Sequence, residues 1–180
     1  MSMTKSIRKL STFFRPESYD IKISIYPDSM TFKGQATISG LKLGPPSHRL
    51  TFHQQYLKIS SATITRHHKL LKQSMTIDRI NYHKSFNEVR LHTREQLYGG
   101  NYRVIMNFSG LINDDIKDIL LGSLKTKKKM QVNVNQFENY FARKLFPCID
   151  DPEIKVNTSL TLISPKQTVV IPRKPDLNIS

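Results

Sequence analysis

Two polar side chains on either side of Phe137 have the type and spacing to bind a cation. Gln136 and Glu138 are two residues apart, so in an extended segment they share one face while Phe137 points the other way. A carboxylate beside an amide forms a receptor for an ammonium group, because a charge-assisted hydrogen bond is a strong one. The alternative, which these residue types by themselves favour, is that Glu138 pairs with Arg143 or Lys144 and only fixes a loop.

The single cysteine, Cys148, is a second candidate. A nucleophilic thiolate needs a nearby cation or helix N-terminus to lower its pKa, whereas Asp150 and Asp151 would raise it. We therefore expect a buried, unreactive thiol; a hydrolase that uses Cys148 would require a histidine within bonding reach. The two adjacent aspartates stand before a proline, and we expect them to shape a turn rather than to act as a catalytic pair.

Histidines are the remaining candidates for chemistry, and a zinc site would need them at fixed spacings. His67 and His68 are adjacent, so on a strand they point to opposite faces. No histidine is followed by glutamate, so the motif His-Glu-x-x-His is absent. We expect the histidines to be exposed or hydrogen-bonded, and we expect this chain to bind no metal or other cofactor. They are His48, His53, His67, His68, His83 and His92.

Alternation of apolar and polar residues dominates the chain and predicts strands that are buried on one face. Tyr19, Ile21, Ile23 and Ile25 illustrate it. The predicted fold class is all-β, a mostly antiparallel β-sandwich with one or two short helices, over 113–121 and around 139–144. Strands are expected over 19–25, 32–38, 50–53, 57–65, 75–80, 89–92, 102–108, 130–134, 156–163 and 168–171.

Composition limits the classes of protein. A length of 180 residues predicts one domain, and 28 Lys+Arg against 14 Asp+Glu give a net charge of +14. Such a field attracts acidic partners, but the only dense basic run is 125–129, so we do not expect nucleic acid as the main partner. A basic β-sandwich module that binds nucleic acid or acidic partners is the alternative function.

The basic start of the chain has no apolar run after it, and no stretch is long enough to span a membrane. A single cysteine suits a reducing compartment, which predicts a cytoplasmic location.

The densest motif lies between 135 and 152, and it has the order of a known family. It resembles the N-terminal domain of the M1 (gluzincin) zinc aminopeptidases, of the aminopeptidase N and puromycin-sensitive type, where Thr-Gln-Phe-Glu precedes Ala-Arg and Phe-Pro-Cys-Trp-Asp-Glu-Pro. This chain departs from that pattern at Asn135, Ile149 and Asp151. The matching residues are Gln136, Phe137, Glu138, Ala142, Arg143, Phe146, Pro147, Cys148, Asp150 and Pro152.

Shorter similarities extend the resemblance upstream from the motif. Pro16-Glu17-Ser18-Tyr19-Asp20 is similar to the family's Pro-x-x-Tyr-Asp opening strand, Phe32-Lys33-Gly34 to its Phe-x-Gly, and Leu97 to Tyr102 to its Leu-x-x-Gly-x-Tyr. Gly122-Ser123-Leu124-Lys125-Thr126 stands where the family has Gly-Phe-Tyr-Arg-Ser, without the aromatics. The resemblance divides the chain into a basic N-terminal extension, 1–14, and an aminopeptidase N-like β-domain, 15–180.

The resemblance implies a saddle-shaped β-sandwich and a role in substrate binding. Gln136 and Glu138 match the family residues that help bind the free α-amino end of a peptide. The zinc ligands and the Gly-x-Met-Glu-Asn segment of the family lie in a following domain, which this sequence does not contain. The chain is therefore expected to be no enzyme on its own, with peptide N-termini and a separate catalytic chain or domain as its partners, and with Arg143, Phe146, Pro147, Cys148, Asp150 and Pro152 as structural motif residues.

Overall fold

Two β-sheets of unequal size form the domain in the computed structural model, which describes residues 9–125, 140–164 and 167–171. The large sheet has the strand order β10-β9-β1-β2-β8-β4-β5, and the small sheet has the order β3-β7-β6. The pairing of β1 with β9 is parallel, and the other pairings in both sheets are antiparallel. The strands are β1 (Phe14–Tyr26), β2 (Thr31–Lys42), β3 (Ser47–His53), β4 (Lys58–His68), β5 (Leu71–Met75), β6 (Ile77–His83), β7 (Glu88–Leu97), β8 (Gly100–Leu111), β9 (Asn157–Ser164) and β10 (Gln167–Ile171).

The helical elements are few, as the sequence predicts. The α-helix α1 covers Asp114–Lys125 and begins directly after Asn113, whose carbonyl accepts a hydrogen bond from the Lys117 amide at 2.9 Å. The predicted turn near 139–144 is the 3-10 helix η4 (Ala142–Lys144). Two further 3-10 helices are η1 (Leu10–Thr12) and η2 (Lys84–Phe86). Within the described ranges, no helix has the length and apolar character to cross a membrane.

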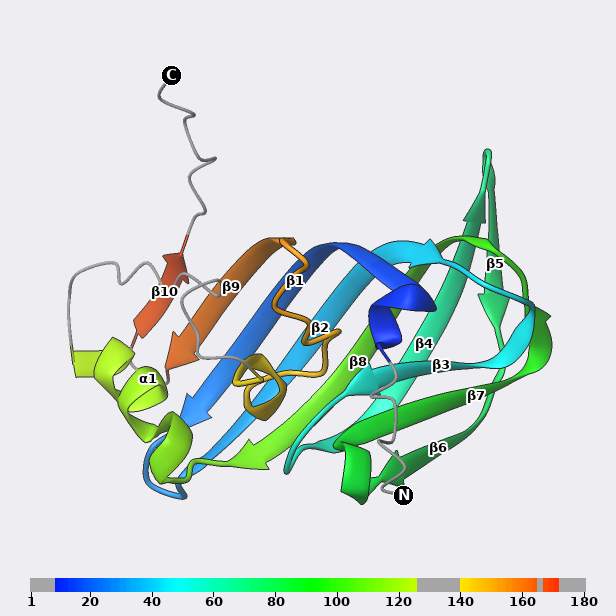
Figure 1. Ribbon diagram of the computed structural model, residues 1–180. Helices are drawn as coiled ribbons and strands as arrows, with labels where there is room; N and C mark the ends of the chain where they lie inside the picture. Colours follow the sequence, from blue (N-terminus) through cyan, green and yellow to red (C-terminus); the bar gives the residue numbers. More distant parts are fainter. Residues whose placement is uncertain (1–8, 126–139, 165–166, 172–180) are drawn as a thin grey trace.

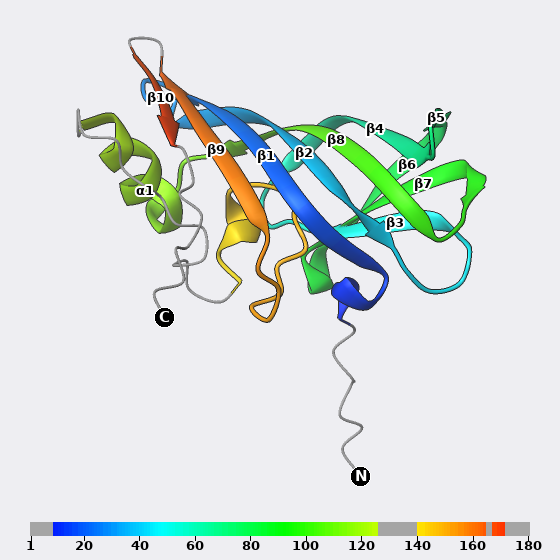
Figure 2. The same cartoon turned by 90° about the horizontal axis from the view of Figure 1, so that it is seen from above.

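The large sheet is covered on one side. Figure 1 shows the small sheet crossing in front of the large one, and Figure 2 shows the small sheet, residues 140–156 and α1 all on the same side of it. The alternation along β1 places Ile21, Ile23 and Ile25 in the core between these layers, where none of the three is exposed. Lys22 and Lys33 are exposed on the other side. The predicted β-sandwich is therefore confirmed, and the core lies between its layers.

The predicted strand over 75–80 is two strands in two sheets. β5 ends at Met75 and β6 begins at Ile77, and the break falls on Thr76. The side chain of Glu95 accepts hydrogen bonds from the Thr76 amide at 2.7 Å and from its hydroxyl at 2.8 Å. These bonds satisfy the backbone where the chain passes from one sheet to the other, which apolar alternation does not reveal. The predicted strand over 130–134 lies outside the described residues.

The predicted boundary between 14 and 15 falls within a packed part of the molecule. Leu10 is 3% exposed and Phe14 is 1% exposed, and both belong to the core. The ring of Phe14 packs edge-on against that of Phe52, with 5.5 Å between the ring centroids. The extent of the domain stays a prediction, since packing of 9–14 does not define where a separate unit ends.

The close pairing of β1 with β2 beside the irregularity between Pro16 and Ser18 requires glycine at position 40, and this requirement is testable. A Cβ on Gly40 would lie 2.5 Å from the carbonyl oxygen of Arg15, which is backbone and has no rotamer to change. Gly40→Ala should lower the free energy of unfolding by about 2 kcal/mol, in the range of overpacked cores. Chemical denaturation followed by circular dichroism measures the effect. Gly122→Ala is the matched control, because a Cβ there meets nothing within 4 Å; in helix α1 it should add up to about 1 kcal/mol. Equal effects of the two substitutions would contradict the close approach.

Candidate functional site

The segment that carries the Phe-Pro-Cys motif is joined to the small sheet through its backbone. The His53 amide donates to the Cys148 carbonyl at 2.7 Å, and the Cys148 amide donates to the His53 carbonyl at 3.1 Å. The Gln55 amide donates to the carbonyl of Arg143 at 2.8 Å. Because β3 is an edge strand, these bonds use groups that a sheet edge would otherwise leave unpaired.

The same segment packs against the large sheet through aromatic rings. Phe146 is fully buried and lies against Tyr19 of β1, with ring centroids 6.0 Å apart. The Ile149 amide donates a hydrogen bond of 3.0 Å to the Tyr19 hydroxyl. Burial raises the pKa of the Tyr19 hydroxyl well above its usual value, so the phenol keeps its proton. Tyr19 thus connects the opening strand to the motif more than a hundred residues later.

An ion pair between Arg143 and Asp150 joins the beginning and the end of the motif. The Arg143 guanidinium donates through Nε to a carboxylate oxygen of Asp150 at 2.9 Å and through a terminal nitrogen to the Asp150 carbonyl at 3.3 Å. The two side chains are 10% and 12% exposed, so solvent screens the pair little. The guanidinium also lies 4.8 Å from the ring centroid of Tyr140. Lys144 pairs instead with Asp115 of α1, at 2.8 Å.

Asp151 shapes the turn that follows, as predicted. One carboxylate oxygen accepts from the Glu153 amide at 3.1 Å, and the other accepts from the Ser11 hydroxyl at 2.7 Å. Burial alone would raise the pKa of Asp151, but these two hydrogen bonds and the charge of Lys9 bring it below its usual value. Asp151 therefore joins the turn to η1, while Asp150 forms the ion pair with Arg143. The two carboxylates have different partners and are not arranged as a catalytic pair.

Cys148 is a buried thiol, as expected. It is 2% exposed, and burial raises its pKa well above the usual value, with a further increase from the charge of Asp150. The opposing effect of Arg143 is smaller. A thiol that stays protonated and out of contact with solvent is a poor nucleophile. The hydrolase hypothesis therefore has no support in this geometry.

His53 lies beside the ion pair as a neutral imidazole. Its Nδ1 accepts a hydrogen bond from the Asp150 amide at 3.0 Å, so this nitrogen carries no proton. Burial lowers the pKa of His53 to about 4, and the Arg143 charge adds to this effect, while Asp151 opposes it. The imidazole acts as a fixed acceptor that holds the backbone of the motif.

Of the other histidines, His48, His68 and His83 are hydrogen-bonded or exposed, as expected, while His67 and His92 are half-buried. His48 Nδ1 lies 3.3 Å from the Thr93 carbonyl, and His83 Nδ1 lies 3.2 Å from the Ser85 hydroxyl. His68 is exposed on β4. In the part of the chain that the structure describes, no group of three or more His, Cys, Asp or Glu side chains could hold a metal ion.

The two residues of the predicted amine receptor are not among those that the structure describes. Gln136 and Glu138 lie outside the described residues, as do Asn135 and positions 126–129 of the basic run. The predicted pairing of Glu138 with Arg143 or Lys144 therefore stays a prediction, although the structure gives both cations other partners, Asp150 and Asp115.

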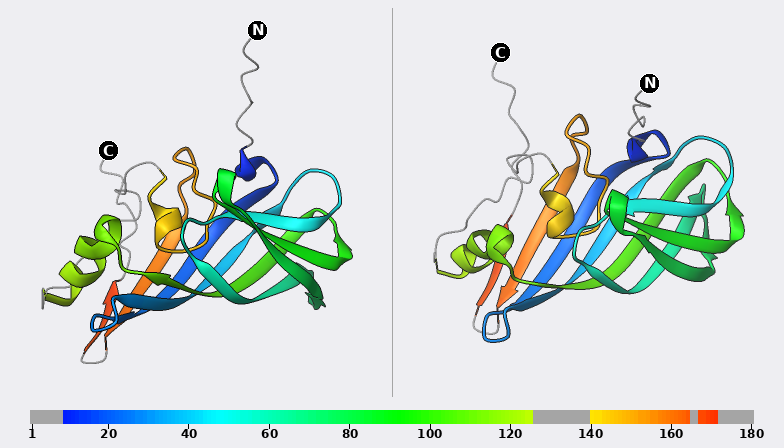
Figure 3. Two further views of the ribbon diagram at one scale, coloured as in Figure 1. Left: turned by 90° about the horizontal axis from the view of Figure 1, so that it is seen from below. Right: turned by 60° about the horizontal axis from the view of Figure 1, so that its bottom comes forward.

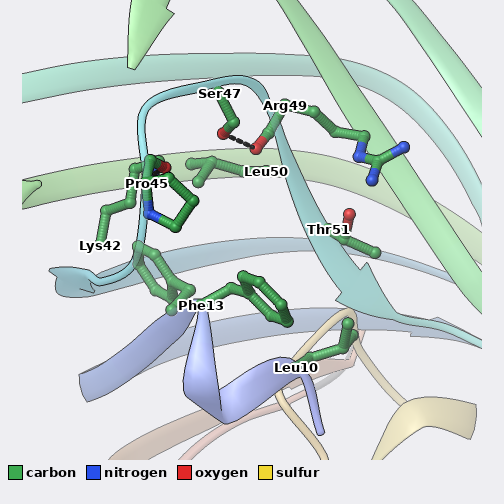
Figure 4. Close-up of a pocket in the computed structure, with 9 residues that line it drawn as sticks. Leu10, Phe13, Lys42, Pro45, Ser47, Arg49, Leu50 and Thr51 are labelled. Atoms are coloured by element: carbon green, nitrogen blue, oxygen red, sulfur yellow. Dashed lines mark hydrogen bonds between the residues drawn. The ribbon is translucent and has the colours of Figure 1, made fainter. Parts of the chain in front are cut away.

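One further cavity was not signalled by the sequence. A cavity of about 160 Å³ lies between η1 and β3, lined by apolar side chains such as Leu10, Phe13 and Leu50 (Figure 4). Lys42 is 4% exposed at its wall, and its ammonium donates to the Pro45 carbonyl at 2.8 Å. Burial lowers the pKa of Lys42. The alternation of β2 places Lys42 on the same face as the buried Ile38, although a lysine by its type is ordinarily assigned to solvent.

The fold and this anchored segment define an all-β domain of two layers, closed by a loop that bonds to both. The chain matches the Peptidase M1 N-terminal domain family over residues 15–177, and it belongs to that family. The aminopeptidase N-terminal domain resemblance of the sequence is thereby confirmed.

Curated relatives agree. Aminopeptidase N of Lactococcus lactis subsp. lactis is 27% identical over 162 residues, which cover 89% of this chain and 17% of the relative. Endoplasmic reticulum aminopeptidase 1 of Rattus norvegicus is 24% identical over 157 residues, 86% of this chain and 17% of the relative. Aminopeptidase M1-D of Oryza sativa subsp. japonica is 24% identical over 171 residues, 94% of this chain and 19% of the relative. The chain thus spans less than a fifth of the length of each.

Breaking the buried ion pair should be costly. Asp150→Asn leaves the Arg143 guanidinium buried without its counter-charge, which typically lowers the free energy of unfolding by about 3–5 kcal/mol. Urea denaturation at pH 7 measures the loss. Asp115→Asn is the control, since it breaks the more exposed pair with Lys144 and should cost less than about 1 kcal/mol. A loss for Asp150→Asn no larger than that of the control would contradict the structural role of the pair.

The low pKa of His53 predicts a specific loss of stability in mild acid. The unfolded chain binds a proton at His53 below about pH 6.5, whereas the folded protein does so only near its pKa of about 4. Stability is therefore full above pH 6.5 and falls as the pH decreases to 4, by about 3 kcal/mol from this group. Urea denaturation at pH 7 and at pH 4.5 measures the difference. His53→Asn keeps an acceptor for the Asp150 amide but cannot titrate, and it should lose less stability between these two pH values. An identical loss in wild type and variant would refute the assignment.

Proposed function

We propose that this chain acts as the N-terminal β-domain of a zinc aminopeptidase. When joined to a zinc catalytic domain, it would bind the free amino terminus of peptides. The observation that carries the proposal is the anchoring of 140–152, the segment that follows Gln136 and Glu138 directly in the sequence. Backbone bonds to β3, the Tyr19 hydroxyl and the buried Arg143–Asp150 pair all act within that segment. Such anchoring gives a rigid base from which two polar side chains can be presented to another domain.

The chemistry of the two proposed side chains suits a peptide amino terminus. Glu138 as a carboxylate would accept charge-assisted hydrogen bonds from an α-ammonium group, and Gln136 would supply its side-chain oxygen. A blocked amino terminus carries no charge and would leave the carboxylate unpaired, so the receptor discriminates between the two. The zinc ion and the water that attacks the peptide bond would belong to the catalytic partner.

The relatives give the proposal its context. Each carries the name of an aminopeptidase, and this chain corresponds to under a fifth of each. We infer that the catalytic part is a separate chain or a further domain, and that the chain by itself hydrolyses no peptide. A reducing compartment such as the cytoplasm fits the single buried thiol.

A complementation assay tests the proposed role of Glu138. The chain is mixed with, or fused to, a form of lactococcal aminopeptidase N from which the part that matches this chain has been removed. We expect hydrolysis of leucine p-nitroanilide to appear only with both parts present. Glu138→Gln should raise KM at least tenfold with a smaller change in kcat, because the lost charge contacts the ground-state ammonium.

Two controls distinguish the role of Glu138 from the role of the domain as a whole. Glu17→Gln removes one exposed carboxylate from β1 and should leave KM unchanged. N-acetylated leucine p-nitroanilide should be a poor substrate of the wild-type assembly. If Glu138→Gln behaves like Glu17→Gln, the amine receptor is wrong while the family assignment stands; if no mixture or fusion gains activity, the docking role is wrong.

A further inference from the structure

The hairpin of β4 and β5 ends in two neighbouring leucines that are exposed to solvent. Leu70 is 99% exposed and Leu71 is 73% exposed, more than any other large apolar side chain in the described part of the chain. Figure 1 shows this hairpin extending beyond the other strands at one end of the molecule. Apolar side chains scattered singly over a surface are common, whereas neighbouring ones form a patch that favours contact with an apolar partner.

The end of this hairpin is exposed on both of its faces. Successive side chains of a strand point to opposite faces, yet every residue from 68 to 74 is exposed. Arg66 pairs with Gln73 and His68 pairs with Leu71, so about 10 Å of hairpin lies beyond Arg66 at about 3.4 Å per residue. A folded protein partner would cover one face of such a tip. The boundary of a lipid bilayer, which is fluid, surrounds a narrow tip on all sides.

The residue types at the tip are not those that a tight turn favours. Lys69 and Leu70 form a two-residue connection between His68 and Leu71. The φ angle of Lys69 is 53°, in the left-handed region that glycine and asparagine adopt most readily. Turn formation by itself therefore does not account for a basic and an apolar residue at this point of the chain.

The tip is positively charged and lacks acidic residues of its own. Lys69 and Lys72 are exposed on either side of the leucines, and the sequence contains no Asp or Glu from 58 to 77. Neither lysine forms an ion pair within the described ranges. The nearby Glu95 carboxylate bonds to Thr76, at the opposite end of β5. Two leucines between two lysines are complementary to a surface with an anionic outer layer and an apolar interior.

We propose that the β4–β5 tip, residues 68–74, docks on an anionic lipid bilayer. Leu70 and Leu71 enter the boundary between the headgroups and the acyl chains, while Lys69 and Lys72 contact the acidic headgroups. A second copy of this chain is a poor occupant, because two domains of net charge +14 repel each other.

Docking through this tip leaves the opposite end of the molecule free. In both views of Figure 3 the hairpin and α1 lie at opposite ends, and the Lys144–Asp115 pair joins α1 to the Phe-Pro-Cys segment. The membrane contact is therefore separate from the proposed amine receptor and does not depend on it.

Tryptophan fluorescence measures insertion of the tip, because the sequence contains no tryptophan. Leu70→Trp is titrated with vesicles of phosphatidylcholine that contain about 30% phosphatidylserine. Its emission should shift to shorter wavelength as the indole enters the boundary region, and vesicles of phosphatidylcholine alone should shift it less. Leu111→Trp, at a leucine of β8 that is 71% exposed, is the control and should show no shift. An unchanged emission of Leu70→Trp, or an equal shift of both variants, would overturn the proposal.

Co-sedimentation with the same vesicles tests the leucine in a chain without a reporter. Leu70→Ser should weaken binding about tenfold, whereas Leu111→Ser should leave it unchanged. Both positions are exposed, so neither substitution should affect folding. Sedimentation velocity without lipid examines the other occupant. A wild-type dimer that Leu70→Ser dissociates would show that a second copy covers the leucines, and the bilayer proposal would be wrong.

Paired lysine variants separate a local contact from attraction to net charge. Lys69→Gln with Lys72→Gln should weaken vesicle binding about tenfold. Lys22→Gln with Lys33→Gln removes the same charge from the exposed face of the large sheet and should have a much smaller effect. Equal weakening by the two pairs would contradict a contact at the tip. Poly-L-glutamate that shifts the Leu70→Trp emission as the vesicles do would identify an acidic polypeptide as the partner and would also overturn the proposal.

Discussion

The buried pair of Arg143 and Asp150 is the interaction on which the organisation of this domain depends. It fixes a short loop whose backbone bonds to the small sheet at His53 and whose amide at Ile149 bonds to Tyr19 of the large sheet. Both charges are removed from water, so their geometry must be maintained for the pair to be favourable. The loop therefore has one position relative to both sheets.

Burial also decides the protonation states around this pair. Cys148 and Tyr19 keep their protons and His53 stays neutral, because burial disfavours the charged form of each group. Groups held in this way are poor acids, bases and nucleophiles at neutral pH. The Phe-Pro-Cys segment thus has a structural role, and any recognition of a ligand must come from side chains beyond it. That division agrees with the membership of the chain in the M1 N-terminal domain family.

The two sheets leave different surfaces to solvent. The large sheet is covered on one side and presents polar side chains such as Lys22 and Lys33 on the other. The small sheet instead has Arg49, Arg79 and His92 in one row on the face turned away from the core. Arg49 lies 30 positions before Arg79, and His92 lies 13 positions after Arg79, so nothing local in the sequence indicates that the three are neighbours. Their mutual proximity follows from strand order, and strand order depends on the packing of the whole chain.

The sequence by itself determined the fold class, most of the strands and the start of α1, because alternation and capping are local properties of the chain. It also determined the family, through the order of Arg143, Phe146, Pro147, Cys148 and Asp150, and it predicted the buried thiol and the turn at Asp151. Only the tertiary structure decided the break at Thr76, the acceptor role of His53 and the pairing of Arg49 and Arg79 with His92. Each of these depends on a partner distant in sequence, and the energies that select such partners, desolvation and cross-strand pairing, exist only once the sheets are assembled.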